Sequence, residues 1–492
     1  MTGITMAAAG AMEWQVSTGK AGRLGGAYRR RSRAAHGRAF GLALGLVLLV
    51  PATSALAQDA DALSFDQARE RLERVSDALA AADANLRARQ DLSDATARLR
   101  LPEISLEARY LEFQKTLSLP LGSLAPVGEA FGIESPLRFQ ERDRRLRPVL
   151  TTVLPLYTGG QIPAAQAAAA AALRGADAER AQQSQKLTSQ LVQAYFGQGL
   201  AEQALSVRRE VRDGMRQHLA HAESLEREGF ATRAQVLQAV VARDASEREY
   251  QKALNDRDAA AQALALLLRS DGPVTPITPL FVVGTSPGTL EAFTRAALER
   301  HPQLAQLRAL DDQAGAGVRV QEASLKPQVY LFGQYDLYRE DALLTDTDWA
   351  FGIGLKYTFL SGRDRPRQIS AARAQQEQAQ AALREAQNQI RIGVAQAWNA
   401  LETARQQFLL LDSSIEQARE NLRLQELAFR EGQSTSLDVM DARLGLGAAR
   451  VEHAHAAYDY CVALAHLLEL GGQSARFGEY IRKADHRVFP HE

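Results

Sequence analysis

One stretch of this chain occurs twice, and this internal repeat constrains the fold more than any other feature. The run Arg227-Glu228-Gly229 returns as Arg430-Glu431-Gly432, 203 positions later. A period of about 200 residues is far longer than the 20–50 residues of a solenoid repeat. The sequence therefore predicts a duplicated domain.

The two copies are expected at 58–270, the first structural repeat, and at 289–472, the second structural repeat. Between them, 271–288 is rich in proline and is predicted to be a linker. The last residues, 473–492, show no periodicity and are expected to form a mobile C-terminal tail.

Each copy is predicted to contain a helix, two strands, a very long helix, a sharp turn and a long helix. In the second copy, apolar residues alternate at spacings of four and three, which indicates a coiled-coil seam. These residues are Ile390, Val394, Ala397, Leu401, Ala404, Phe408, Leu411, Ile415, Ala418 and Leu422. In the first copy, a helix from Pro163 to Glu228 would be about 100 Å long, so its seam needs packing partners.

Glycines mark the predicted helix boundaries, because glycine accepts the left-handed backbone conformation that ends a helix. Gly229 and Gly432 end the very long helices, and Thr232 and Thr435 are suited to cap the helices that follow. Strand-to-helix turns are expected at Gly159, Gly160 and Gly362.

Four short segments alternate apolar and polar residues, as half-buried strands do. They lie at about 102–113, 147–157, 327–338 and 348–359. Each is roughly 8–11 residues long, which is enough to cross a bilayer as a tilted strand. The aromatic residues expected near the strand ends, as in an interfacial girdle, are Tyr335, Tyr338, Trp349 and Tyr357.

A soluble four-stranded sheet covered by a helix is the alternative interpretation of these strands. Four strands cannot close a barrel, however, and an open sheet edge is not tolerated in lipid. A membrane location therefore requires several chains to share one barrel.

The segment 111–147 makes the first copy longer than the second and is predicted to be an inserted surface loop between the first two strands. It contains Pro120, Pro126 and Pro136. Its arginines form either a solvated basic face or contacts with outer-membrane lipid phosphates. They are Arg138, Arg142, Arg144, Arg145 and Arg147.

Residues 1–57 have the layout of a secretory signal peptide. A basic run ends near Arg38, an apolar run extends from Ala39 to Val50, and Ala55-Leu56-Ala57 resembles a cleavage site. The apolar run is too short to cross about 30 Å of hydrocarbon as a helix, which disfavours a membrane anchor. We expect cleavage after Ala57. Since the next residue, Gln58, is not a cysteine, we expect an exported chain that is not lipidated.

Charge and cysteine content exclude several classes of function. The 58 basic and 58 acidic residues give no support for nucleic-acid binding. The single cysteine, Cys461, excludes a disulfide framework and a cysteine-based zinc site. No nucleophile elbow, phosphate loop or dinucleotide fingerprint is present, so neither an enzyme nor a cofactor is expected.

The chain resembles the TolC-type outer-membrane efflux protein family. The resemblance rests on the duplicated plan, on the turns at 156–160 and 359–362, and on the two glycine tips. Its most specific part is the run 432–442, Gly-Gln-Ser-Thr-Ser-Leu-Asp-Val-Met-Asp-Ala.

The resemblance implies a mainly α fold with a small membrane β part. Three chains would form a homotrimer with a twelve-stranded barrel, open to the outside and continued by a long helical barrel through the periplasm. A periplasmic adaptor protein and an inner-membrane pump would dock at the tips. The corresponding residues are Arg227, Glu228, Gly229, Thr232, Arg430, Glu431, Gly432 and Thr435.

Asp438 and Asp441 are three residues apart and share one helix face. They are either carboxylates that favour the positive end of a helix or, by resemblance, the aspartates that line the periplasmic aperture. In a trimer, six carboxylates would concentrate cations and raise one another's pKa. Ser434 stands where a well-studied member has an arginine that ties the aperture shut, so the closing contacts are an open question.

Other classes remain open at this stage. A soluble periplasmic coiled-coil scaffold or adaptor protein is the main alternative, and the cargo of a channel is not determined. Two histidine pairs, at 218 and 221 and at 453 and 455, suggest either metal ligands or solvent-facing side chains. We expect the latter. The first pair lacks nearby carboxylates at a metal-like spacing, apart from Glu223. The second pair is two residues apart and cannot converge on one helix face.

Overall fold

The computed structural model describes residues 61–337 and 348–489. The chain divides into two units, Met1–Ala57 and Gln58–Glu492. The predicted signal peptide and Tyr338 lie outside the described residues.

The two halves of this unit contain the same order of main elements. The first half has α1 (Phe65–Val75), α2 (Asp77–Ala97), β2 (Glu103–Leu119), β3 (Leu137–Tyr157), α4 (Gln161–Arg227) and α5 (Arg233–Leu267). The second half has α6 (Leu290–Arg300), α7 (Pro302–Ala323), β6 (Gln328–Asp336), β7 (Trp349–Lys356), α8 (Arg365–Arg430) and α9 (Ser436–Leu470). Helices α4 and α8 have 67 and 66 residues, and α5 and α9 have 35 each.

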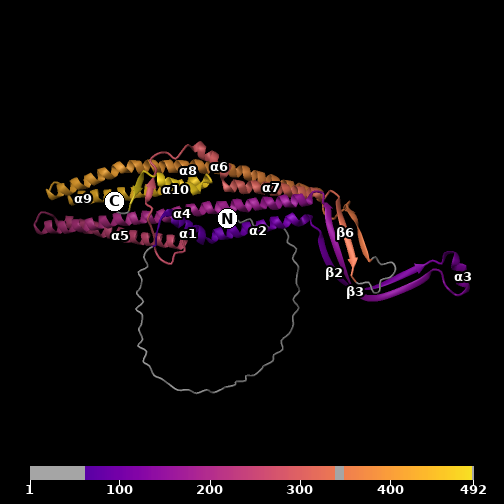
Figure 1. The fold of residues 1–492 in the computed structure, drawn as a ribbon. Helices are drawn as coiled ribbons and strands as arrows, with labels where there is room; N and C mark the ends of the chain where they lie inside the picture. Colours follow the sequence, from indigo (N-terminus) through magenta and orange to yellow (C-terminus); the bar gives the residue numbers. More distant parts are fainter. Residues whose placement is uncertain (1–60, 338–347, 490–492) are drawn as a thin grey trace, which may run out of the picture. The chain divides into compact units, whose positions relative to one another are not determined.

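The long helices pack as two hairpins that lie side by side (Figure 1). Helix α4 contacts α5, α7 and α9, and α8 contacts α7 and α9. In α8, the predicted seam from Ile390 to Phe408 is buried. The apolar stripe therefore meets the neighbouring helices of the same chain over this stretch.

The antiparallel main sheet has the order β2-β3-β6-β7. Strand β6 pairs with β3 only between Val149 and Tyr157, whereas β2 and β3 pair as far as Leu119 and Leu137. Beyond the four-stranded part, β2 and β3 continue as a two-stranded ribbon (Figure 1).

The prediction of a surface loop at 111–147 is wrong for most of that segment. Both strands continue through it, and Glu112 pairs across them with Arg142 at 2.6 Å and with Arg144 at 3.0 Å. The high charge of the segment favoured the interpretation as a loop. It concealed both the alternation of residues along the strands and the possibility of ion pairs between them. Only residues 120–136 connect the strands, through η2 (Gly122–Leu124) and α3 (Ala125–Ala130).

The four-stranded part has one exposed apolar face. On β7, Trp349, Phe351, Ile353 and Leu355 are 66–70% exposed. Register places them beside apolar residues of the other strands, which are Ile104, Leu106, Leu150, Leu331 and Tyr335. The described helices do not cover this face, so the covered soluble sheet of the alternative interpretation is not what the structure shows.

The strand-to-helix turns differ in their need for glycine. Gly159 has φ +67°, and a Cβ there would lie 2.8 Å from the carbonyl oxygen of Ala323. Gly160 has φ +96° and precedes α4. Gly362 has open space around it, and Asp364 caps α8 instead by accepting a hydrogen bond from the Arg367 amide at 3.1 Å.

The predicted linker and tail are both structured. Strand β4 (Val274–Pro276) of the linker pairs with β1 (Asp61–Leu63), and β5 (Leu280–Val282) pairs with β8 (His486–Val488). After α9, η3 (Ser474–Arg476) and α10 (Phe477–Lys483) lead to β8. The expectation of a mobile tail is wrong for residues 473–489, while 490–492 lie outside the described residues.

An aromatic cluster fixes these segments to the long helices. Phe477 lies 5.0 Å from Phe65 and 5.6 Å from Phe281, ring centre to ring centre, and Phe196 contacts all three. Buried aromatic rings contribute large apolar areas to a core. The isolated aromatic residues of the tail and the linker gave no periodic pattern, so the sequence could not place them here.

Among the residues that the structure describes, helices long enough to cross a membrane all lack the required apolar stretch.

Candidate functional site at the helix-hairpin tips

The two hairpin tips are built alike. Gly229 and Gly432 have φ values of +79° and +70°. At each tip an amide hydrogen bonds back to the helix, from Phe230 to Leu225 at 2.8 Å and from Gln433 to Ala428 at 2.8 Å. This pattern ends a helix because glycine adopts the left-handed conformation without a Cβ clash.

Capping boxes begin the returning helices. Thr232 accepts a hydrogen bond from the Gln235 amide, and the Gln235 side chain accepts one from the Thr232 amide at 2.7 Å. Thr435 and Asp438 make the same reciprocal pair, with the Thr435 amide 2.8 Å from Asp438 Oδ2. Both predicted caps therefore lie where the sequence placed them.

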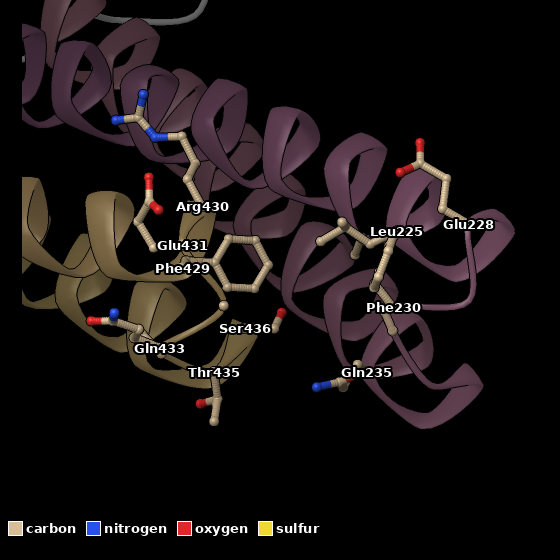
Figure 2. Close-up of a pocket in the computed structure, with 14 residues that line it drawn as sticks. Leu225, Glu228, Phe230, Gln235, Phe429, Arg430, Glu431, Gln433, Thr435 and Ser436 are labelled. Atoms are coloured by element: carbon tan, nitrogen blue, oxygen red, sulfur yellow. The ribbon is translucent and has the colours of Figure 1, made fainter.

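A cleft of about 740 Å³ lies between the tips (Figure 2). Residues from both hairpins line it, and they include apolar side chains: Ala222, Leu225, Phe230, Ala231 and Phe429. Phe230, at the end of the first hairpin, is 80% exposed. Together with the apolar lining of the cleft, this ring forms an exposed apolar surface that another molecule could contact.

Of the predicted tip residues, Glu228, Arg430, Glu431, Gly432 and Thr435 line the cleft. Arg227, Gly229 and Thr232 belong to the same turns but do not line it. The sequence did not single out Phe230. Phe230 is exposed because it follows the glycine of a turn. Periodic patterns describe helices and strands, so they do not indicate a residue in a turn.

Asp438 has a defined structural role. Its carboxylate accepts hydrogen bonds from the Thr435 hydroxyl at 2.6 Å and the Thr435 amide at 2.8 Å, and from Ser434 at 3.3 Å. These bonds hold the pKa of Asp438 below its usual value, so it is charged at neutral pH. The like-charge effect expected in a ring of copies concerns several chains and stays a prediction.

Asp441 lies one turn further along α9 and is exposed. It takes no part in the capping box. In the first hairpin, Gln235 occupies the capping position of Asp438. The two aspartates therefore differ: the first stabilises the start of its helix, and the second is available for another role.

A buried histidine joins the two hairpins just behind the tips. His218 on α4 is 6% exposed, its Nε2 hydrogen bonds with the Ser436 hydroxyl, and its ring lies 5.2 Å from Phe429. Ser436 and Phe429 belong to the other hairpin. The prediction that His218 faces solvent is wrong, because α4 presents this side to α8 and α9.

An ion pair adjoins this histidine. Arg443 on α9 pairs with Glu426 on α8. The side chain of Arg443 crosses Gly214 on α4, where a Cβ would lie only 2.7 Å from its Cδ. Glycine at 214 therefore allows the arginine to lie between the hairpins. We refer to His218, Ser436, Arg443 and Glu426 as the inter-hairpin latch.

Burial lowers the pKa of His218, and electrostatic interactions with Arg443 and His221 lower it further, while Glu426 opposes them. His218 is therefore neutral at pH 7 in the packed state. Protonation of His218 disfavours packing. The stability that the neutral histidine contributes is therefore lost as the pH falls below 6.5, the ordinary pKa of a histidine side chain.

The second histidine pair lies away from the tips. His453 stacks on Phe408 and bonds to Asp412 at 2.8 Å, whereas His455 is exposed and bonds to Asp459 at 3.0 Å. His453 is thus mostly covered, contrary to prediction. Within 61–337 and 348–489, groups of three or more side chains arranged to hold a metal ion are absent.

The exposed apolar sheet, the two very long helices and the paired tips define a class: proteins that carry helical hairpins on a membrane-type β sheet. The model of the outer membrane efflux protein family matches residues 68–268 and 294–473. The chain belongs to this family, which confirms the resemblance seen in the sequence. The family consists of channels, so the prediction that the chain is not an enzyme is also confirmed.

The chain is also similar in sequence to individual proteins. The chain is 25% identical over 295 residues to outer membrane efflux protein BepC of Brucella suis, covering 58% of this chain and 62% of BepC. It is 24% identical over 298 residues to alkaline protease secretion protein AprF of Pseudomonas aeruginosa, covering 58% and 61%. The match thus spans about three fifths of each relative's length.

A solved structure has the same fold. The outer membrane protein VceC of Vibrio cholerae superimposes with a TM-score of 0.67 and 17% identity, covering 83% of this chain and 96% of VceC. At this identity the likeness concerns the fold.

The latch leads to a pH-dependent prediction. Lowering the pH from about 7.5 to about 5.5 should increase hydrogen–deuterium exchange at 429–440, after correction for intrinsic rates, because protonated His218 loses its packed state. His218→Gln should remove this pH dependence. The matched variant His455→Gln, at an exposed site, should retain it; equal pH dependence in all three proteins would contradict the assignment.

Proposed function

We propose that this protein is the outer-membrane channel of a tripartite efflux or type I secretion system. It works as a homotrimer whose strands form a twelve-stranded barrel and whose helices form a tunnel through the periplasm. One observation carries the proposal: a four-stranded sheet with an exposed apolar face and two open edges continues directly into two helices of 66 and 67 residues.

The sheet edges account for the number of chains. Strands β2 and β7 are the outer strands, and their outward backbone groups lack sheet partners in the described chain. Unpaired backbone groups cost several kcal/mol each in hydrocarbon. Pairing β2 of one copy with β7 of the next satisfies them, and three copies with four strands each make a twelve-stranded barrel.

Family membership supports the location and the direction of transport. We propose export with a cleaved, non-lipidated signal peptide, a barrel in outer-membrane lipid and helices in the periplasm. BepC is named for efflux and AprF for secretion of alkaline protease. The exported cargo is therefore proposed as a class that includes small molecules, metal ions and polypeptides.

The tips suit the partner side of such a system. A periplasmic adaptor protein, itself in contact with an inner-membrane pump, would dock on the cleft between the hairpins and cover Phe230. The mixed lining offers the combination that specific interfaces use, an apolar anchor with a polar rim.

The channel itself can be tested directly. Protein extracted from outer membranes in detergent should migrate as a heat-modifiable trimer and conduct ions in planar bilayers. The competing scaffold or adaptor function predicts a water-soluble protein without conductance. Recovery of such a soluble monomer from the periplasm would contradict the channel proposal.

Asp441 is proposed to line the narrow periplasmic end of the tunnel. Asp438→Asn combined with Asp441→Asn should weaken the block of single-channel current by multivalent cations, because three copies lose six carboxylates. Asp441→Asn alone should produce most of the change, because Asp441 is exposed whereas the carboxylate of Asp438 is engaged in the capping box. The single variant also leaves that capping box intact. Glu452→Gln, an exposed charge elsewhere on α9, is the control, and unchanged block in the double variant would refute the assignment.

Phe230 is proposed as the anchor for the adaptor. Phe230→Ala should weaken binding of the cognate adaptor by about 2 kcal/mol, or roughly thirtyfold, as loss of a buried aromatic anchor does. Conductance and trimer stability should not change. Leu266→Ala, at the opposite end of α5 and 78% exposed, is the matched control; equal affinities by calorimetry would exclude this docking mode.

A further inference from the structure

The β2–β3 ribbon is much longer than a membrane crossing requires. Strands β6 and β7 have 9 and 8 residues, whereas β2 and β3 have 17 and 21. From the pair Arg109–Arg147 to the pair Leu119–Leu137, the ribbon adds eleven cross-strand pairs. At about 3.3 Å per residue, these pairs extend roughly 35 Å past the four-stranded part.

The register identifies the two faces of this ribbon. The exposed apolar face of β7 continues through Tyr335 and Leu150 to Leu106 on β2. In a lipid-inserted barrel this face meets hydrocarbon. On β2 it carries the even-numbered residues, so Glu103, Ser105, Glu107 and other odd-numbered residues face the lumen.

Tyr110 and Leu146 still continue the apolar lipid-side face into the ribbon, and beyond this pair the chemistry of the two faces is exchanged. The face that continues the lipid side becomes polar and is exposed; it carries Glu112, Gln114, Thr116, Ser118, Arg138, Gln140, Arg142 and Arg144. The face that continues the lumen side becomes apolar near its far end, where Leu117 lies opposite Phe139 and Leu119 opposite Leu137. Lower on this face, Lys115 lies opposite Glu141.

The ribbon ends in a folded apolar tip. A Cβ at Gly128 would lie 2.9 Å from Leu121 Cδ1 and 3.3 Å from the Ile133 carbonyl, so the connection is closely packed. The Ser135 hydroxyl accepts a hydrogen bond from the Leu121 amide at 3.2 Å. The large apolar residues left exposed there include Leu124, Val127 and Phe131, the last of which is 80% exposed.

We propose that the far ends of three ribbons pack against one another through this inward apolar face and close the outer mouth of the barrel, in contrast to the open mouth that the family resemblance implies. The inference rests on the proposed trimeric channel. The partner is the same chain in its other two copies. The residues that meet are Leu117, Leu119, Leu137, Phe139 and the exposed apolar tip.

Geometry and charge favour this partner. Each ribbon continues strands β2 and β3 of one copy, so the three copies of the proposed barrel place three ribbons at the same end of one ring of strands. In a twelve-stranded ring with strands about 4.8 Å apart and tilted by about 40°, each strand lies roughly 12 Å from the axis. The ribbons are long enough to reach it, and the basic, polar outer faces remain in water.

Cysteine cross-linking tests the direction of the two faces. The only native thiol, Cys461, is buried. In detergent-extracted trimers of the full chain, oxidation of Leu117→Cys should give disulfide-linked dimers, whereas Ser118→Cys, the adjacent outward residue, should not. Equal cross-linking at both positions, or cross-linking at Ser118→Cys alone, would overturn the proposal.

Conductance tests closure independently. Replacing 112–144 by an Asn-Gly turn should leave the trimer intact and raise single-channel conductance several-fold, because an apolar constriction limits flow. Trimers that conduct no better than the parent protein would overturn closure by the ribbons while leaving the proposed channel standing. A shortened protein and a parent protein that both lack trimers and conductance would overturn the channel proposal itself.

Discussion

The open edges of one small sheet impose the largest constraint on this protein. Four strands expose a continuous apolar face, and in the proposed channel that face lies in hydrocarbon, where an unpaired backbone amide or carbonyl is costly. A single chain offers no partner for the outer edges of β2 and β7 among its described residues. In the proposed channel, assembly of several copies therefore satisfies the backbone hydrogen bonds of these edges, and it would bring the helices attached to each strand pair into one ring.

Two long helices connect this sheet to the tips. Helices α4 and α8 are single elements of 67 and 66 residues, and packing holds them at both ends. Near the sheet, Gly159 lets α4 start against α7. Near the tips, the inter-hairpin latch holds α4 against α8 and α9 through a buried histidine and an ion pair. The aromatic cluster around Phe477 secures the region between them.

Local patterns predicted the repeated elements well. The heptad spacing of α8, the glycines of the tips and the threonine caps depend on neighbours within a few residues, and the structure places them as expected. The prediction failed where long-range pairing decides the outcome. The charged segment 111–147 is mostly a ribbon because backbone pairing joins positions far apart in the sequence, such as Glu112 and Arg144. The tail is ordered because Phe477 meets Phe65 and Phe281.

By itself, the sequence determined the two long hairpins, their glycine tips and the four strands, and it predicted a duplicated plan and a membrane location for the strands, because periodicity and turn chemistry are local properties. It also pointed to Asp438 and Asp441 through their spacing. Only the tertiary structure decided that Asp438 is held by a capping box, that His218 is buried between hairpins and that Phe230 borders a cleft. Each of these depends on which helix faces which, and that follows from packing across distant parts of the chain.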